Sequence, residues 1–212
     1  MPASNRYRYG ARWYDLLSGE RLIYRAGRLA AIGAMDLRPG QTVLDVGCGT
    51  GLSFEAIATR IGPGGHLVGV DESAQMLARA RRRAADLGCR VTLGTLDVSA
   101  THDPGWRLVE ENPPDAVLFA YTLSIMPAWP CAWEQILDRV SPGTRIVVLD
   151  MAVPTGGGRP VQWAARGAAW LGGADLQSHP WQAMPGSTVG TTSMTLRAGH
   201  VVVTTGIRRP AE

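Results

Sequence analysis

The residues best suited to chemistry are two acids and a set of glycines near the start of the chain. Residues 43–51 read VLDVGCGTG, and twenty residues later a second apolar run ends in Gly69-Val70-Asp71. Glycines in such a turn let the backbone approach a ligand closely and adopt angles that a Cβ atom would forbid. An acid at the tip of the next strand can accept hydrogen bonds from a ribose diol. The spacing therefore predicts a nucleotide-like ligand held by one βαβ unit.

Strands that alternate with helices are expected to position these residues. Apolar runs predict strands at 42–46, 67–70, 91–93, 116–121 and 145–150 and helices at 52–61, 73–87 and 132–140. This order is typical of a parallel sheet covered by helices on both faces. Residues 193–196 and 200–207, joined by Arg197-Ala198-Gly199, predict an antiparallel hairpin that closes one edge of the sheet.

The length of 212 residues suits one α/β domain. We expect a helical N-terminal extension over residues 1–38 and the main domain over residues 39–212. Within that domain, the segment 153–186 is rich in glycine, alanine and tryptophan and is expected to form a lid over the mouth of the site.

Composition narrows the possible functions. The net charge is +3, and all 21 basic residues are arginines. Arginines gather at residues 6–12 and 79–83, which we interpret as solvated faces because no aromatic-interleaved nucleic-acid motif accompanies them. The three cysteines form no CxxC pair, so neither a disulfide framework nor a metal site is predicted. Without a signal-peptide core or an apolar run of bilayer length, we expect a cytoplasmic protein, at most peripheral to the inner membrane surface.

In their order, these residues resemble the class I S-adenosylmethionine-dependent methyltransferases, over residues 14–207. The family's glycine-rich turn matches Asp45 to Gly51, its ribose-binding acid matches Asp71, and its adenine-contacting acid matches Asp97. The resemblance implies a Rossmann-like, doubly wound, mostly parallel seven-stranded sheet with an antiparallel C-terminal hairpin. It also implies S-adenosyl-L-methionine as the methyl donor, S-adenosyl-L-homocysteine as the product, and no metal.

The family's donor contacts carry over to individual positions. The resemblance implies that Gly47 and Gly49 pack against the methionine moiety and that Asp45 helps to hold its ammonium group. Asp71 then binds both ribose hydroxyls, and Asp97 accepts a hydrogen bond from the adenine amino group. The predicted donor site is completed by Cys48, Gly51, Glu72, Met76, Leu96 and Ala120.

A dinucleotide site with the pattern GxGxxG is the main alternative for the glycine turn. Leu52 occupies the position that the third glycine would need. Asp45 has no role in dinucleotide binding, whereas it offers a partner to a methionine ammonium group. A P-loop is excluded, because the sequence contains no lysine to complete its motif.

Methyl transfer from a sulfonium is an in-line displacement, so alignment and desolvation carry most of the catalysis. Tyr14 and Tyr121 are the predicted wall residues for the acceptor, although Tyr121 could equally pack at its strand end. His179 and Asp150 are candidate proton acceptors. A lone histidine before a proline is more often a structural turn residue, and this alternative stays open for His179.

The acceptor is predicted from weaker motifs. Residues 14–17, 121–129 and 145–150 look like those of bacterial phosphatidylethanolamine N-methyltransferases and are similar to those of ubiquinone and menaquinone C-methyltransferases. If residues 159–171 are helical, Trp163 and Trp170 share a stripe flanked by Arg159 and Arg166, which suits a lipid interface or a packed lid.

We therefore predict a methyltransferase that acts on an amine of a phospholipid headgroup or a similar small molecule. O-, N- or C-methylation of an aromatic or quinone-like metabolite is the alternative. A third hypothesis is a protein that binds the donor without catalysis. Peripheral membrane contact is a possible partner interaction, nucleic acid is not expected, and the oligomeric state is left open.

Overall fold

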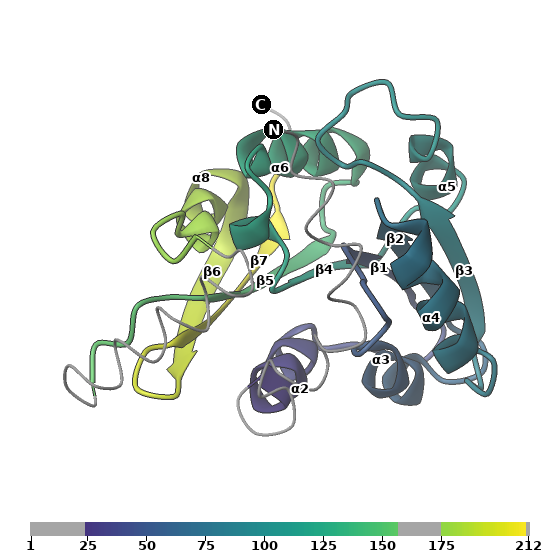
Figure 1. Cartoon of the computed structure of the whole chain (residues 1–212), viewed down its shortest axis with the longest axis horizontal. Coiled ribbons are helices and arrows are strands. Elements are labelled where there is room, and N and C mark those ends of the chain that lie inside the picture. Colours follow the sequence, from purple (N-terminus) through teal and green to yellow (C-terminus); the bar gives the residue numbers. More distant parts are fainter. Residues whose placement is uncertain (1–23, 157–174, 211–212) are drawn as a thin grey trace.

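A single seven-stranded sheet with helices on both faces forms the molecule (Figure 1). The computed structural model describes residues 24–156 and 175–210. The strands are β1 (Thr42–Val46), β2 (His66–Asp71), β3 (Arg90–Thr95), β4 (Ala116–Ala120), β5 (Arg145–Met151), β6 (Thr188–Leu196) and β7 (Val201–Arg208). The helices are α2 (Tyr24–Ala34), α3 (Phe54–Ile61), α4 (Ala74–Ala84), α5 (Trp106–Glu110), α6 (Trp129–Arg139) and α8 (Met184–Ser187), and the short 3-10 helices are η2 (Leu123–Ile125) and η3 (Pro180–Ala183).

The strand order is β3-β2-β1-β4-β5-β7-β6. Strands β1 to β5 pair in parallel, and β7 runs antiparallel to both of its neighbours, β5 and β6. From β1 the strands are added toward one edge up to β3, and from β4 they are added toward the other edge. Sheets of this kind bind ligands at such a switch point, at the carboxyl ends of their strands. The prediction of a mostly parallel, doubly wound sheet with an antiparallel C-terminal hairpin is confirmed.

Two layers of side chains on opposite faces of the sheet make up the core. Along β1, Val43 packs on the face covered by α2, α3 and α4, whereas Leu44 and Val46 pack on the face covered by α5, α6 and α8. Successive side chains in a strand point to opposite faces, so Asp45 shares the face of Val43. Asp150 in β5 lies on the opposite face of the sheet, the face on which Val148 packs.

Some boundaries differ from those expected from the sequence. Helix α3 begins at Phe54 because the N–H groups of Gly51 and Phe54 make turn hydrogen bonds to Cys48 O and Gly51 O, respectively. Strand β6 begins at residue 188, five residues earlier than expected. It is an exposed edge strand rich in threonine, with a register shift between Val189 and Thr192, so it shows little apolar alternation.

Helix α2 packs on β4, β5 and β7. Its buried side chains include Tyr24, Ala31 and Ile32. Residues 1–23 of the predicted N-terminal extension, with Tyr14, lie outside the described residues, as do residues 157–174 of the predicted lid with their tryptophans. Within the described ranges, no helix has the length and apolar character needed to cross a membrane.

Candidate functional site

The turn after β1 is a glycine cradle at the carboxyl edge of the sheet. Gly47, Gly49 and Gly51 all have positive φ, at 64°, 56° and 79°. A Cβ atom on Gly47 would collide with the side chain of Thr122, and one on Gly51 would lie 2.6 Å from the ring of Phe54. Above Gly49, by contrast, there is open space to 4 Å. The outer two glycines are therefore required by packing, and the middle one leaves room for a ligand.

Asp71 joins the tip of β2 to this cradle. Its Oδ2 accepts a hydrogen bond from the Gly49 N–H at 2.8 Å, and its Oδ1 accepts one from the Ser73 N–H at 2.9 Å. Burial raises the pKa of Asp71, and these two bonds oppose the shift. A carboxylate oxygen can accept more than one hydrogen bond, so Asp71 retains capacity for hydroxyl donors such as those of a ribose.

Asp97 and Glu72 lie near Asp71 and add negative charge. Asp97 Oδ1 accepts from the N–H and Oγ of Ser99 at 2.9 and 2.6 Å. The pKa of Glu72 is raised by partial burial and by the charges of Asp71 and Asp97. This concentration of carboxylates is unfavourable for the phosphates of a dinucleotide and compatible with the uncharged ribose and adenine of S-adenosylmethionine.

Asp45 is a buried acid that lacks a full set of partners. It is 1% exposed, and its Oδ2 has no hydrogen-bond partner. Burial raises its pKa to about 7; the charge of Arg28 opposes the shift and that of Asp71 adds to it. A buried carboxylate oxygen without a partner is unfavourable for the fold unless a ligand satisfies it. An ammonium group in the cradle would do so, and the residues present therefore fit the methionine moiety of the donor.

The other residues assigned to the donor site lie around this cradle or near it. Cys48 is buried, its N–H donates to Val70 O at 2.9 Å, and burial raises the pKa of its thiol. Met76 is half-buried in the first turn of α4, where its N–H donates to the capping Ser73 Oγ at 3.3 Å. Leu96 is buried after β3, and Ala120 is half-buried at the end of β4. Their contacts with the donor stay predictions.

Tyr121 directly follows β4 and holds α2 against the sheet. Its backbone is left-handed, with φ 59°, and its N–H donates to Leu149 O at 2.7 Å. Its hydroxyl donates to Tyr24 O at 3.2 Å, and the two tyrosine rings meet edge to face at 5.0 Å. Burial raises the pKa of Tyr121 well above its usual range, so the phenol stays neutral. Packing is thus one function of Tyr121; its contact with an acceptor stays a prediction.

The two candidate proton acceptors have different surroundings. His179 adopts a left-handed conformation, with φ 42°, at the start of η3, and its ring lies 5.1 Å from that of Trp181. Asp150 is fully buried and accepts from Ser124 Oγ at 2.5 Å and from the N–H groups of Ser124 and Met151 at 2.9 Å. Burial raises the pKa of Asp150 to about 6. Asp150 therefore anchors the segment after β4, and a proton-transfer role for His179 stays a prediction.

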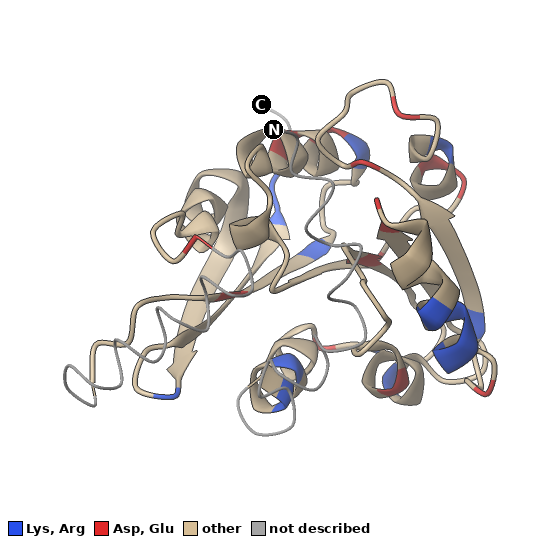
Figure 2. Cartoon of the chain, in the orientation of Figure 1, with Lys and Arg blue, Asp and Glu red and all other residues tan. Residues whose placement is uncertain are grey.

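Two features near the site were missed or misinterpreted in the sequence. Tyr24 and Arg28 lie four residues apart on α2, a spacing that places both on one helix face, and this signal could have drawn attention to them. The arginines of α4 gather in its last turn (Figure 2). Arg83 is not merely solvated, because its guanidinium donates to Thr50 O at 2.7 Å and Thr50 Oγ1 at 3.0 Å and thereby supports the glycine turn.

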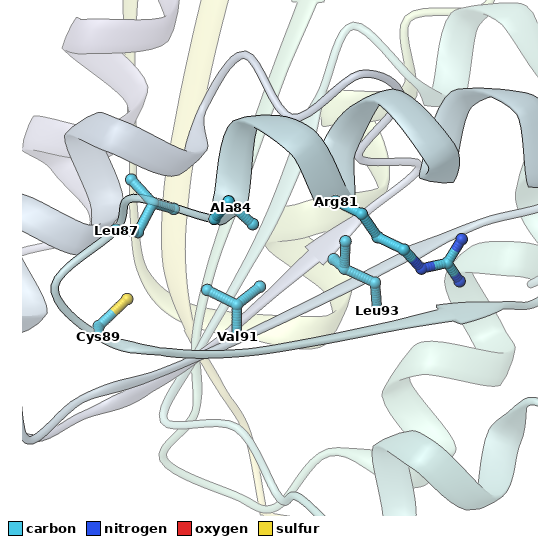
Figure 3. A pocket seen from close by; sticks show the side chains of 7 residues that line it. Arg81, Ala84, Leu87, Cys89, Val91 and Leu93 are labelled. Atoms are coloured by element: carbon cyan, nitrogen blue, oxygen red, sulfur yellow. The ribbon is translucent and has the colours of Figure 1, made fainter.

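A separate open cavity of about 420 Å³ lies between α4 and β3 (Figure 3). It is close to the amino end of β3, whereas Asp71 stands at the carboxyl end of β2, so the cavity is distinct from the glycine cradle. The cavity is lined by Arg81, Ala84, Ala85, Leu87, Cys89, Val91 and Leu93.

Among the described residues, no three His, Cys, Asp or Glu side chains lie close enough together to hold a metal ion.

Comparison with known proteins indicates the same class of protein as the geometry of the glycine cradle, the methyltransferases. A family model described as a methyltransferase domain matches residues 43–143. The demethylmenaquinone methyltransferase of Bacillus cytotoxicus is 29% identical over 133 residues, which are 62% of this chain and 54% of that protein. A ubiquinone/menaquinone biosynthesis C-methyltransferase of Pseudomonas savastanoi is 32% identical over 141 residues, 66% of this chain and 53% of that protein. The chain thus spans about half the length of these relatives.

A phosphoethanolamine N-methyltransferase of Arabidopsis thaliana is 31% identical over 116 residues, 55% of this chain and 22% of that protein. Among solved structures, the methyltransferase SibL superposes with a TM-score of 0.66 at 20% identity, covering 94% of this chain and 58% of SibL. Magnesium protoporphyrin IX methyltransferase from Synechocystis, with bound S-adenosylhomocysteine, gives 0.60 at 19% identity, covering 87% and 85%. These two structures show that the fold is shared.

Proposed function

We propose that the chain is an S-adenosylmethionine-dependent methyltransferase that transfers the donor's methyl group to a small-molecule acceptor, supported by the family model over residues 43–143 and by the methyltransferases it resembles. Two observations carry the proposal: the buried Oδ2 of Asp45 in β1 has no hydrogen-bond partner, and there is open space above Gly49 in the turn that follows β1. The donor supplies a sulfonium-bound methyl group for in-line displacement. The protein's part is to hold and orient the donor and to exclude water.

Each donor contact is proposed for a residue whose surroundings suit it. Asp45 accepts from the ammonium group, which removes the cost of its unpartnered oxygen. Asp71 accepts from the ribose hydroxyls while its bonds to Gly49 and Ser73 fix its orientation. Asp97 accepts from the adenine amino group, with Ser99 holding its other oxygen in place.

For the acceptor, we place a quinone-like aromatic ring first. The relatives named for demethylmenaquinone and ubiquinone match 62% and 66% of this chain, whereas the relative named for phosphoethanolamine matches 55%. The sequence motifs alone favoured a phospholipid headgroup amine. That amine is the second candidate, and its support is the similarity to the phosphoethanolamine N-methyltransferase. If a phospholipid is the acceptor, the protein must also contact a lipid surface.

The test of the proposed function has two stages. Calorimetry with S-adenosylhomocysteine measures donor-site binding. We expect saturable binding that Asp71→Asn weakens and that Asp86→Asn, a change of an exposed acid in the turn after α4, leaves unchanged. Labelled donor is then incubated with a demethylated naphthoquinol, with phosphoethanolamine and with phosphatidylethanolamine vesicles. Binding followed by transfer to none of these would support the non-catalytic alternative, and absence of binding would contradict the proposed function.

A further inference from the structure

The loop that carries Asp97 joins β3 to α5 and is tied to the start of that helix. The Asp97 N–H donates to Asp103 Oδ2 at 3.2 Å, and Asp103 Oδ1 accepts from the Gly105 N–H at 2.7 Å. The Trp106 N–H donates to Asp103 O at 3.2 Å. A Cβ atom on Gly105 would collide with Thr95 O, so the loop closes tightly on the end of β3. One side chain, that of Asp103, thus connects the main chain of Asp97 to α5.

The middle of the loop is held from α6. Trp106 is buried, and its indole Nε1–H donates to Ala100 O at 2.8 Å. The guanidinium carbon of Arg139, in the last turn of α6, lies 4.1 Å from the centroid of the Trp106 ring, which is a cation–π contact. The same guanidinium donates to Thr101 O at 3.1 Å. Arg139 and Trp106 therefore hold two consecutive carbonyl groups of the loop.

Arg139 is itself fixed by its neighbours. Its Nη1 donates to Gln135 O at 3.1 Å and to Gln135 Oε1 at 2.6 Å, and its Nε lies 3.7 Å from Glu110 Oε1. The Arg139 side chain is only 18% exposed. A cation–π contact is stronger where it is shielded from water. The contact with Trp106 is therefore stronger than the same pair would be on the open surface.

Recognition of adenine through Asp97 depends on where its carboxylate stands. Ser99 donates to Asp97 Oδ1 through its N–H and its Oγ, so Oδ2 is the oxygen that would meet the adenine amino group. A 6-oxopurine presents an acceptor in place of that donor, and two acceptors held together are unfavourable. A carboxylate that is held in place enforces this difference, whereas one that can move away from the base does not.

We propose that Asp103 and Arg139 are positioning residues for base recognition: they hold the loop so that Asp97 accepts from a 6-amino group and rejects a 6-oxo group. The proposal rests on the proposed function, because it assumes that S-adenosylmethionine binds with its adenine at Asp97. Neither positioning side chain needs to touch the donor, since both act through the main chain of the loop. The determinants of base specificity then extend from the end of β3 to the last turn of α6.

Calorimetry with S-adenosylhomocysteine and S-inosylhomocysteine, which differ in the 6-amino and 6-oxo groups, tests the proposal. In the unmodified protein, the 6-oxo ligand should bind roughly tenfold to hundredfold more weakly. In Arg139→Met and in Asp103→Asn that ratio should fall by at least about threefold, mainly through weaker binding of S-adenosylhomocysteine. Arg107→Met is the matched control and should retain the full ratio. Arg107 follows Trp106 directly, but it is exposed and its guanidinium pairs with Glu111.

Hydrogen exchange without ligand measures the loop itself. Arg139→Met and Asp103→Asn should speed the exchange of amides in residues 97–106 and leave that of β1 unchanged, whereas a general loss of stability would speed both. Arg139→Lys retains a charge for the Trp106 ring but loses the planar fork of donors, so we expect an intermediate ratio and intermediate exchange. Thermal unfolding identifies which variants are folded, and Arg139→Lys replaces Arg139→Met if the latter is not.

Three results would overturn the inference while the proposed function stands. One is equal binding of the two ligands by the unmodified protein. Another is a pair of folded variants, at Arg139 and Asp103, that weaken both ligands by the same factor, as a merely structural role would. The third is unchanged exchange of residues 97–106 in those variants. If S-adenosylhomocysteine fails to bind the unmodified protein, the proposed function itself fails and base recognition with it.

Discussion

Donor affinity should depend on pH through Asp45. This carboxyl is buried, one of its oxygens has no partner, and its pKa is raised to about 7. The charged groups that act on it are Arg28 of α2, which lowers its pKa, and Asp71 of β2, which raises it. The nearby Cys48 thiol has a raised pKa and stays protonated. Because only the ionised carboxylate attracts an ammonium group, donor binding should weaken as the pH falls through about 7.

The magnitude follows from that pKa. If only the ionised form binds, the apparent dissociation constant scales with 1 + 10^(pKa − pH). With a pKa of about 7, lowering the pH from about 8 to about 6 weakens binding by about tenfold, or about 1.4 kcal/mol. Asp45→Asn should bind more weakly than the unmodified protein at pH 8 and should lose this dependence between pH 6 and 8.

Calorimetry with S-adenosylhomocysteine at several pH values measures the effect, and urea unfolding without ligand is the companion assay. A carboxyl with a pKa of 3.8 in the unfolded chain and about 7 in the fold contributes stability below pH 3.8 and loses it as the pH rises through about 7. Asp45→Asn should therefore raise the free energy of unfolding at pH 8, by at most about 4 kcal/mol. A pH-independent affinity in the unmodified protein, or the same pH slope in Asp45→Asn, would refute the reasoning.

Three further changes test other parts of the site. Gly49→Ala should lower the free energy of unfolding by only about 1 kcal/mol, because its Cβ meets open space, yet should abolish donor binding in calorimetry. Gly47→Ala should lose more stability in thermal unfolding, because its Cβ would collide with the side chain of Thr122. Asp71→Asn should weaken S-adenosylhomocysteine binding by about 1 to 3 kcal/mol, and unchanged affinity would place the ribose elsewhere. Ser124→Ala should lower the free energy of unfolding by about 1 to 3 kcal/mol at pH 8, because the buried Asp150 carboxylate loses a donor, and a neutral result in urea would contradict that role.

The central strands could be predicted because their apolar sequence agrees with their buried position in the sheet. In β1, a buried apolar run leads into a turn whose glycines have the positive φ that the sequence implied. Strand β6 was harder to delimit. An exposed edge strand needs no apolar alternation, and its threonines and glycine resemble a loop until β7 provides the pairing partner.

For the site, sequence patterns predicted the residues carried by the strand ends, and they did not reveal the contribution of α2. Asp45 and Asp71 occupy fixed positions relative to the glycine turn, so their placement follows from local spacing. The approach of Arg28 to Tyr121 joins residues almost a hundred positions apart, and it depends on how α2 packs on the sheet. The support that Arg83 gives to Thr50 is a contact of the same long-range kind.

The interior place of β7 has a consequence for how the chain acquires its donor site during synthesis. Strand β7 follows β6 in the chain, yet it lies between β5 and β6, so β6 cannot join the sheet until β7 has emerged. Helix α2 packs on β7, and Thr205 Oγ1 donates to Ala34 O at 3.4 Å. A nascent chain can therefore assemble β1 to β5 and the glycine turn first, while the helix that carries Arg28 reaches its full packing only after residues 201–208 leave the ribosome. The packing of α2 against the sheet is therefore among the last features of the fold to form.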